Sequence, residues 1–358
     1  MTRSAVKSVP AVSSFIHDAL VTLKDADAAQ SPPIRKLPLG PCAANLRVWQ
    51  NSDVLDPAGR LLRACISDDK GSKPVVGIDL HICVGSQTPI GLPPPDWPFP
   101  IDDRNSFQRV FWDPAGHRAL TADEQSGVWN LMNPKAGLGL IWIKDMKGLP
   151  GWEYSSPLRH HFHWSALMTG STLAHAAAFD TPSGAIMLTG PGGSGKSTTT
   201  AAAIVHGWKI IGEDLCWVEF DEDRVFAHRL YNTLKITDEA RSEFRFIDDL
   251  VESHDHEQFE KTVVYLDETL LARERDELRA IFCLSGAFAP KTAITPCSKG
   301  LAFRLIAPST LFLMRTASVE TTSRLRALVD RLPTFHVTLG ADPMEVVAAL
   351  GRFAGELP

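Results

Sequence analysis

A glycine-rich segment, GPGGSGKS, occupies residues 190–197 and contains the residue types that bind phosphate. It fits the pattern G-x-x-x-x-G-K-[ST] at every position. Glycines allow backbone conformations in which N–H groups point at phosphate oxygens, and a following helix presents its positive end to them. Lys196 would contact the β- and γ-phosphates of a nucleoside triphosphate, and Ser197 would ligate Mg²⁺. The residues expected to bind the nucleotide are Gly190, Pro191, Gly192, Gly193, Ser194, Gly195, Lys196, Ser197 and Thr198.

The sequence around this segment predicts the elements that a phosphate-binding loop requires. An apolar strand over residues 185–188 precedes the loop, and an alanine-rich helix over residues 197–206 follows it. A further strand is expected over residues 209–211, and a helix over 159–172 and a strand over 175–179 are expected upstream. The pattern alone occurs by chance, but the strand–loop–helix–strand context indicates an α/β unit that binds a nucleotide.

An acidic pair, Glu213 and Asp214, follows the last of these strands. A carboxylate at a strand end beside a phosphate loop usually binds the metal ion or orients the nucleophile. The predicted metal ligands are therefore Ser197, Glu213 and Asp214. His175 lies 21 residues before Lys196. Position alone does not assign His175 a catalytic role, because a lone histidine is more often a packed core or surface residue.

The stretch from His175 to Asp214 resembles the catalytic core of the HPr kinase/phosphorylase family, which shares its core with phosphoenolpyruvate carboxykinase. That family separates a histidine from the loop lysine by 21 residues, and the lysine from an acidic pair by 17 and 18, as here. The resemblance implies that Asp214 takes the proton from an acceptor hydroxyl, or binds the metal, and that His175 tunes its charge. Glu213 departs from the family, which has an aspartate there.

A closer resemblance is to HPr-kinase-like enzymes that phosphorylate lasso-peptide precursors. It extends over about residues 150–340 and rests on the segments PLRHHFHW, LAHAAAF, LYNTLKI, LRAIF, LIAPSTL and LPTFHVTLG. It implies an ATP- and Mg²⁺-dependent kinase that transfers the γ-phosphoryl group to a serine hydroxyl of a peptide or protein. HPr kinases are oligomeric, so a homo-oligomer is a further expectation. The catalytic residues predicted from the motifs and the resemblance are Asp214, His175, Lys196 and Arg279.

Three residues outside the loop are candidate ligands of phosphate. Arg279 precedes an apolar strand, and a buried arginine there could stabilise the charge of a transferring phosphoryl group. Lys235 and Lys261 lie in segments that carry the resemblance, and either could bind a phosphate as a point charge. For both lysines, a solvated or ion-paired side chain is the favoured interpretation.

Other functions stay open at this stage. The chain could be a small-molecule kinase, or a non-catalytic module that uses bound nucleotide to order a partner surface. A decarboxylating carboxykinase is disfavoured, since no arginine pattern for oxaloacetate is recognisable. The regulatory C-terminal segment of HPr kinases is not recognisable either, which leaves HPr as a substrate and the reverse phosphorolysis in doubt. The motif does not distinguish ATP from GTP.

The first 150 residues predict a mostly β and irregular domain without a catalytic motif. Its expected role is substrate recognition or packing against a kinase domain over residues 151–358. Strands are expected at 46–49, 61–66, 74–84, 107–112 and 138–143, a helical period spans 13–23, and a proline-rich surface loop covers 89–103. The predicted fold is therefore α/β, with an N-terminal mostly-β domain and a phosphate-loop core like that of HPr kinase and the carboxykinases.

Composition narrows the partners and the compartment. The 358 residues are 44% apolar and carry a net charge of −6 with interleaved signs, which argues against nucleic-acid and membrane binding. The six cysteines form no C-x-x-C pair, and the N-terminus has no compact apolar segment of a signal peptide. Both features favour the cytoplasm. Two minor expectations are a partly packed helix surface for His160, His161 and His163, and a helix N-cap at Ser309.

Overall fold

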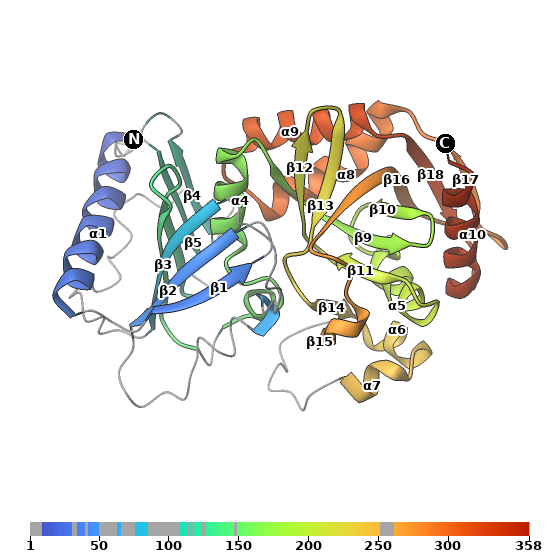
Figure 1. Cartoon of the computed structure of the whole chain (residues 1–358), viewed down its shortest axis with the longest axis horizontal. Coiled ribbons are helices and arrows are strands. Elements are labelled where there is room, and N and C mark those ends of the chain that lie inside the picture. Colours follow the sequence, from blue (N-terminus) through green and yellow to red (C-terminus); the bar gives the residue numbers. More distant parts are fainter. Residues whose placement is uncertain are drawn as a thin grey trace, which may run out of the picture.

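The computed structural model describes residues 9–30, 34–39, 42–49, 63–65, 76–84, 108–113, 115, 117–123, 126–146, 149–250 and 261–357. All structural statements below refer to these residues, and the predicted loop at 89–103 lies outside them. A seven-stranded sheet and a nine-stranded sheet lie side by side, together with helices and a two-stranded sheet (Figure 1). The predicted mixed α/β class is confirmed.

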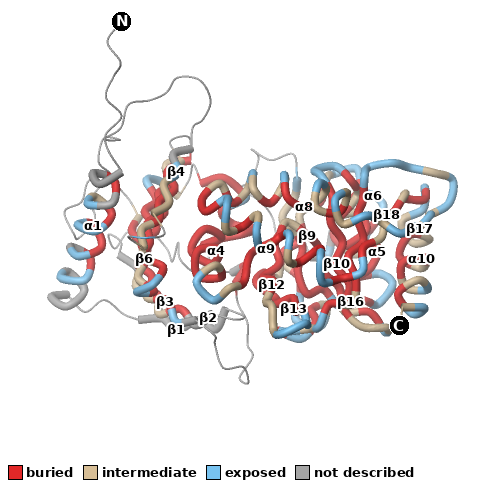
Figure 2. The backbone as a smooth tube through the Cα atoms, turned by 90° about the horizontal axis from the view of Figure 1, so that it is seen from above, coloured by how far each residue is buried: buried red, intermediate tan, exposed pale blue. Residues whose placement is uncertain are grey.

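The first sheet has the strand order β1-β2-β3-β7-β6-β5-β4. The strands are β1 (Ile34–Leu39), β2 (Cys42–Trp49), β3 (Val76–Val84), β4 (Gln108–Asp113), β5 (Arg118–Asp123), β6 (Val128–Asn133) and β7 (Leu138–Ile143). Strands β2, β3 and β7 pair in parallel, and the remaining neighbours are antiparallel. Helix α1 (Val9–Gln30) packs Ile16, Leu20 and Leu23 against Leu120 and Trp129 of this sheet. Figure 2 shows the buried side of α1 facing the strands.

Most predicted elements of this half are confirmed, with two kinds of error. The predicted strand at 61–66 is wrong, because its described residues form the 3-10 turn η1 (Arg63–Cys65). Strand β1 was missed, and so were strands β5 and β6. Thr121 and Asn130 are buried in these strands and hydrogen-bonded to each other at 3.1 Å. Since the strands are buried on both faces, they lack the alternation that reveals a half-exposed strand.

The second sheet has the order β11-β9-β10-β16-β13-β12-β8, with β18 and β17 continuing from β16. Its strands are β8 (Thr172–Ala174), β9 (Ala176–Thr181), β10 (Gly184–Thr189), β11 (Lys209–Gly212), β12 (Cys216–Asp221), β13 (Arg224–His228), β16 (Arg275–Phe288), β17 (Ala293–Pro296) and β18 (Thr334–Leu339). Strands β10, β16 and β18 are parallel, so their carboxyl ends meet at one edge. A separate two-stranded antiparallel sheet pairs β14 (Thr233–Ile236) with β15 (Thr262–Tyr265).

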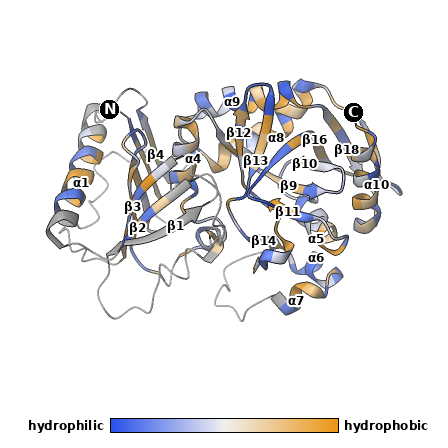
Figure 3. Ribbon diagram, in the orientation of Figure 1, coloured by the Kyte–Doolittle hydropathy of each residue, from blue (hydrophilic) through white to orange (hydrophobic). Residues whose placement is uncertain are grey.

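Helices cover both faces of the second sheet. Because side chains alternate along a strand, Ile186 and Leu188 of β10 join one core cluster, and Met187 joins the other. Figure 3 shows hydrophobic stretches on the strands and on the helices that cover them. The first face packs on α5 (Lys196–Val205) and α10 (Pro343–Gly355), and the second on α8 (Lys299–Leu313) and α9 (Ser318–Arg331). The remaining helices are α3 (Gly151–Ser155), α4 (Arg159–Met168), α6 (Asp238–Glu243), α7 (Phe246–Leu250) and the 3-10 turn η2 (Glu268–Leu270).

The two sheets share a hydrophobic core. One cluster contains Leu46 and Ile141 of the first sheet together with Trp164 of α4 and Trp217 of the second sheet. The backbone N–H of Asn232 also donates to a carbonyl of η1, at 2.9 Å. The predicted boundary near residue 150 falls between the sheets, and independent folding of the two halves stays a prediction. None of the helices in the described part of the chain combines the length and apolar composition that a bilayer crossing requires.

The histidine cluster of α4 lies in the protein interior, which corrects the expected helix surface. His161 and His163 are fully buried, and His160 nearly so. Nε2 of His161 lies 3.2 Å from the carbonyl oxygen of Leu140 in β7, and Nε2 of His163 lies 3.0 Å from the hydroxyl of Thr321 in α9. The imidazoles therefore connect α4 to both halves. A run of polar residues is typical of a solvated face, so the sequence alone does not reveal this burial.

Acidification should destabilise the fold through these imidazoles. Burial lowers the pKa of His161 to about 4 and that of His163 to about 3, from an ordinary 6.5. Below pH 6.5 the unfolded chain binds protons that the folded chain excludes, so the free energy of unfolding falls as the pH drops toward the folded pKa values. At pH 5 each histidine would lower it by about 2 kcal/mol. Chemical denaturation at pH 7 and pH 5 measures the difference.

The control for this experiment is a histidine on the surface. His163→Gln should lose part of the pH dependence, whereas His206→Gln, at an exposed position, should retain all of it. An unchanged pH dependence in both variants would contradict the role of the buried imidazoles.

Ser309 lies inside α8 and does not cap a helix. Its hydroxyl donates to the carbonyl oxygen of Ile306 at 3.3 Å, and the N-cap of α8 is Ser298. The prediction was wrong because α8 begins ten residues earlier and continues through Pro308.

Candidate active site

The predicted phosphate loop connects β10 to α5 at the carboxyl edge of the second sheet. A Cβ on Gly190 would lie 2.5 Å from the carbonyl oxygen of Leu284, and one on Gly195 would lie 2.6 Å from Cδ1 of Leu339. Gly195 also has a φ of 95°. It is the N-cap of α5 and, as a glycine, has no side chain that could accept a hydrogen bond from the first N–H groups of the helix. These N–H groups are therefore oriented to bind an anion.

Lys196 begins α5, one residue earlier than predicted, and its side chain folds back over the loop. Its Nζ donates to the carbonyl oxygens of Gly190, at 2.7 Å, and Pro191, at 3.1 Å. Burial lowers the pKa of Lys196, and the residue forms no ion pair within the described ranges. The hydroxyl of Ser194 is also buried and has no hydrogen-bond partner there. A buried cation and a buried hydroxyl donor thus line the loop, and neither contacts a carboxylate directly among the described residues.

Glu213 follows β11 and contacts the first turn of α5. Ser197 donates its hydroxyl to Oε1 of Glu213 at 2.6 Å, and the backbone N–H of Lys235 lies 3.3 Å from Oε2. Burial raises the pKa of Glu213, and the negative charge of Asp214 raises it further. Ser197 and Glu213 therefore form one cluster of oxygen ligands beside the loop.

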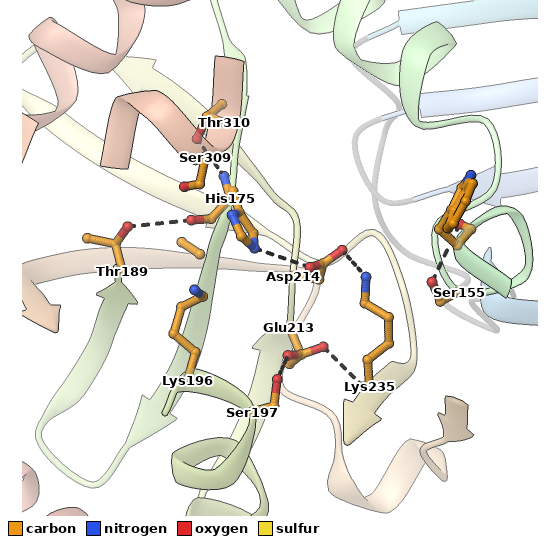
Figure 4. A network of polar contacts seen from close by, with 12 residues as sticks. Ser155, His175, Thr189, Lys196, Ser197, Glu213, Asp214, Lys235, Ser309 and Thr310 are labelled. Carbon is orange, nitrogen blue, oxygen red and sulfur yellow. Dashed lines mark hydrogen bonds and ion pairs between the residues drawn. The ribbon is translucent and has the colours of Figure 1, made fainter. Parts of the chain in front are cut away.

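Asp214 lies between His175 and Lys235 (Figure 4). Its Oδ1 is 3.2 Å from Nε2 of His175, and Lys235 donates to Oδ2 at 2.6 Å. Burial alone would raise the pKa of this carboxyl, but Lys235 and His175 outweigh burial and hold the pKa well below its usual range. Asp214 has a φ of 74°, an uncommon conformation for a residue with a side chain. The chain therefore turns sharply here, which directs the carboxylate at both partners.

His175 joins β8 to β9 and is fixed by its backbone. Its N–H donates to the hydroxyl of Thr310 in α8 at 2.9 Å, and its carbonyl accepts from Thr189 at 3.4 Å. The Nδ1 atom is buried and has no hydrogen-bond partner among the described residues. His175 and Asp214, which the resemblance implied to act together, are thus brought together. Thr310 was not singled out, and no local signal in the sequence marks it.

Lys235 is the site residue that the sequence analysis undervalued. The favoured interpretation was a solvated or ion-paired lysine, and Lys235 is ion-paired: its ammonium group contacts Asp214 and its backbone contacts Glu213. It belongs to β14, outside the sheet that carries the loop. In the sequence, only the resemblance of the segment LYNTLKI indicated that Lys235 could belong to the site. A contact between two separate sheets produces no periodic pattern of apolar residues that would reveal it. Lys261 precedes β15 and is exposed.

Arg279 lies at the other end of β10 from the phosphate loop. Strands β10 and β16 are parallel, and Cys283 pairs with Thr189 next to the loop, four residues after Arg279. The guanidinium group donates to the carbonyl oxygens of Ser183 and, at 2.7 Å, Leu357. The expected role of Arg279 in stabilising transferring charge is therefore wrong. Its contacts attach the C-terminal segment to the turn between β9 and β10.

The assembled residues fit a nucleotide with a bound magnesium ion. Mg²⁺ is usually held by one or two carboxylates together with phosphate oxygens and water. Ser197, Glu213 and Asp214 offer hydroxyl and carboxylate oxygens of this kind, on the side of the loop toward β11. The unpartnered donors at Ser194 and at the start of α5 suit phosphate oxygens. Thr198 is half-buried in the first turn of α5, within the same segment.

Comparison with known proteins adds little to this geometry. No protein-family model matches the chain, and no curated protein matches it. Among solved structures, the HPr(Ser) kinase/phosphatase from Coxiella burnetii is similar at 10% sequence identity over 51% of this chain and 97% of that chain. The TM-score of that superposition is 0.26. A likeness this weak carries no argument about function, which has to be inferred from the residues of this chain.

Proposed function

We propose that this protein is an ATP-dependent kinase that transfers the γ-phosphoryl group to a serine hydroxyl of a peptide or protein. The observation that carries the proposal is the position of Asp214. Its carboxylate lies between His175 and Lys235, and the adjacent Glu213 bonds to Ser197 of the phosphate loop. A simple nucleotide-binding module needs the loop but has no need of a fixed, ionised carboxylate beyond it.

Each residue then has a defined task in the transfer. Lys196 and the N–H groups of the loop bind the β- and γ-phosphates, while Ser197 and Glu213 would hold Mg²⁺. The metal ion, when bound, neutralises charge on the phosphate oxygens. Asp214 orients the acceptor hydroxyl and takes its proton as the serine oxygen forms its bond to the γ-phosphorus and the bond to the β–γ bridging oxygen breaks. The products are phosphoserine, ADP and a protonated Asp214.

His175 and Lys235 set the charge of the base. Both groups favour the ionised form of Asp214, so it is ready to accept a hydrogen bond from the hydroxyl. A base with a depressed pKa accepts a proton only late in the transfer, when the serine oxygen has lost most of its basicity. Movement of Lys235 toward the phosphoryl group would at the same time raise the basicity of Asp214.

We also propose that the half before residue 150 binds the acceptor. Lys235 of β14 borders the base, and the neighbouring Thr233 donates to the carbonyl oxygen of Ser155 in α3 at 2.8 Å. The backbone N–H of the adjacent Asn232 donates to the carbonyl oxygen of Ala64, in the half before residue 150, at 2.9 Å. Figure 4 shows Ser155 on the side of Asp214 away from Lys196. An acceptor peptide that reaches Asp214 from the side away from the nucleotide would therefore lie against the half before residue 150. A lasso-peptide precursor is the acceptor that the sequence resemblance implies.

Mass spectrometry of peptides tests the reaction. The protein is incubated with ATP, Mg²⁺ and synthetic peptides that differ only in carrying serine, threonine or tyrosine at the central position, including a lasso-precursor leader and core. Phosphoserine formation with release of ADP is the expected result. Tight binding of ATP without transfer to any peptide, or transfer only to a metabolite, would exclude a peptide kinase.

Removal of the Lys235 charge should slow transfer without preventing nucleotide binding. In Lys235→Met, Asp214 loses its closest counter-ion, so the pKa of Asp214 rises and its ionised fraction at low pH falls. The acidic limb of the rate–pH profile should move to higher pH, so the loss of rate should be largest at the acidic end of the profile and smallest near neutrality. Steady-state rates between pH 5 and 8 measure both effects.

The control is Lys144→Met, which removes an exposed charge from the turn after β7. It should leave the rate and the profile unchanged. A Lys235→Met enzyme with the profile of the parent would show that Lys235 does not control Asp214.

A further inference from the structure

Strand β16 runs past the phosphate loop and ends beside it. The carbonyl oxygen of Leu284 lies 2.5 Å from the position of a Cβ on Gly190, and a Cβ on Gly286 would lie 4.0 Å from Cα of Ser194. The strand then continues to Phe288, which pairs with Leu339 of β18. The loop and the end of β16 are therefore neighbours in space, although about ninety residues separate them in the sequence.

Phe288 is connected to the start of α5 through Leu339 of β18. Its pairing partner Leu339 places Cδ1 2.6 Å from the position of a Cβ on Gly195, the N-cap of α5. The next residue, Ala289, donates its N–H to the carbonyl oxygen of Leu339 at 2.8 Å, which fixes the end of β16. The aromatic ring is thus carried by a hydrogen-bonded strand end next to the loop.

The ring of Phe288 is 69% exposed, in contrast to other phenylalanines of the same sheet. Phe282, six residues earlier in β16, is fully buried and packs against Phe335 with ring centroids 5.5 Å apart. The four residues 285–288 are all exposed, so this end of β16 extends beyond the cover of the helices. An exposed aromatic ring on a fixed backbone offers a flat surface to a ligand at low cost in conformational entropy.

The order of the strands gives the direction in which a nucleotide would lie. The acids Glu213 and Asp214 follow β11, on one side of β10, whereas β16 and β18 lie on the other side (Figure 1). A triphosphate whose γ-phosphate meets the acids has its α-phosphate and nucleoside toward β16 and β18. The base then reaches the end of β16, where the ring of Phe288 is exposed.

We propose that Phe288 is the platform on which the base of the bound nucleotide stacks. The inference rests on the proposed function, since it requires a triphosphate in the loop with its γ-phosphate at the acids. Stacking uses the π-face that every base has, so it favours large purines over pyrimidines and distinguishes ATP from GTP only weakly. The protein should therefore bind MgATP and MgGTP with similar affinity and bind MgCTP less tightly.

The test compares ligands with and without a base. Dissociation constants for MgATP and for magnesium tripolyphosphate are measured by calorimetry with the parent protein, Phe288→Ala and Phe312→Ala. Phe312 is a matched control, because its ring in α8 is 65% exposed. Phe288→Ala should weaken MgATP binding about tenfold and leave tripolyphosphate binding unchanged. Phe312→Ala should change neither value.

A tryptophan substitution gives a second, independent readout. In Phe288→Trp the larger ring keeps the stacking surface, so MgATP affinity should be retained or increased, and MgATP should quench the added fluorescence. Tripolyphosphate should not quench it. The parent protein, with its nine tryptophans, provides the background signal.

The outcomes separate the two proposals. Unchanged MgATP binding in Phe288→Ala, or equal weakening of MgATP and tripolyphosphate, would overturn the stacking role while the loop stays a phosphate site. A parent protein that binds neither ligand would instead overturn the proposed function on which the stacking depends.

Discussion

Asp214→Asn should bind MgATP nearly as well as the parent protein and lose phosphoryl transfer by about a thousandfold. The amide keeps the size of the side chain but cannot accept the proton of the acceptor hydroxyl. It also loses the charge that His175 and Lys235 now stabilise at 3.2 and 2.6 Å. Single-turnover transfer to a serine peptide and calorimetric titration with MgATP measure the two properties separately.

The control for this variant is Asp267→Asn, an exposed carboxylate that caps η2. It should retain both binding and transfer. Near-normal transfer by Asp214→Asn would show that Asp214 is not the base. A combined loss of MgATP affinity and transfer would assign Asp214 to the metal ion, with the base elsewhere.

Lys196→Met should lose about a hundredfold in affinity for MgATP and for tripolyphosphate alike. The buried ammonium group contacts only the carbonyl oxygens of Gly190 and Pro191 in the described structure, so its charge is available to the phosphates. Charge-assisted hydrogen bonds to two phosphate groups account for a loss of this size. Equilibrium binding of both ligands measures it.

The stability of Lys196→Met without ligand supplies the structural control. Burial already disfavours the charged form of Lys196, as its lowered pKa indicates. Methionine fills similar space without that cost, so the free energy of unfolding should stay constant or rise. Unchanged MgATP affinity would contradict the assignment of the loop. A large loss of stability would indicate that Lys196 mainly supports the loop structure.

Local patterns in the sequence predicted the centre of the candidate site. The loop, the strand before it and the helix after it are contiguous, and each depends on neighbouring residues. The spacing of His175 and the acidic pair around Lys196 was also informative, because short strands and tight turns leave little freedom between them. The prediction of these elements therefore agreed with the structure to within a few residues.

The errors came from contacts between distant segments. The sequence did not reveal the direction of β16 relative to β10, so Arg279 was predicted in the site although it binds the carbonyl of Leu357 at the opposite edge. The histidines of α4 were expected near the surface because burial of polar side chains depends on partners such as Thr321. Strands β5 and β6 were missed because their buried polar residues hid the alternation.

By itself, the sequence determined the strand, glycine-rich loop and helix at residues 184–205, because these elements depend on neighbouring residues, and it predicted that the loop binds phosphate. Tertiary structure alone decided which cation faces Asp214, because Lys235 arrives on a separate two-stranded sheet. It also decided that Phe288 is exposed beside the loop and that Arg279 lies away from it. These positions depend on the order and direction of the strands. Packing of the whole sheet selects that order, and no short segment of the sequence encodes it.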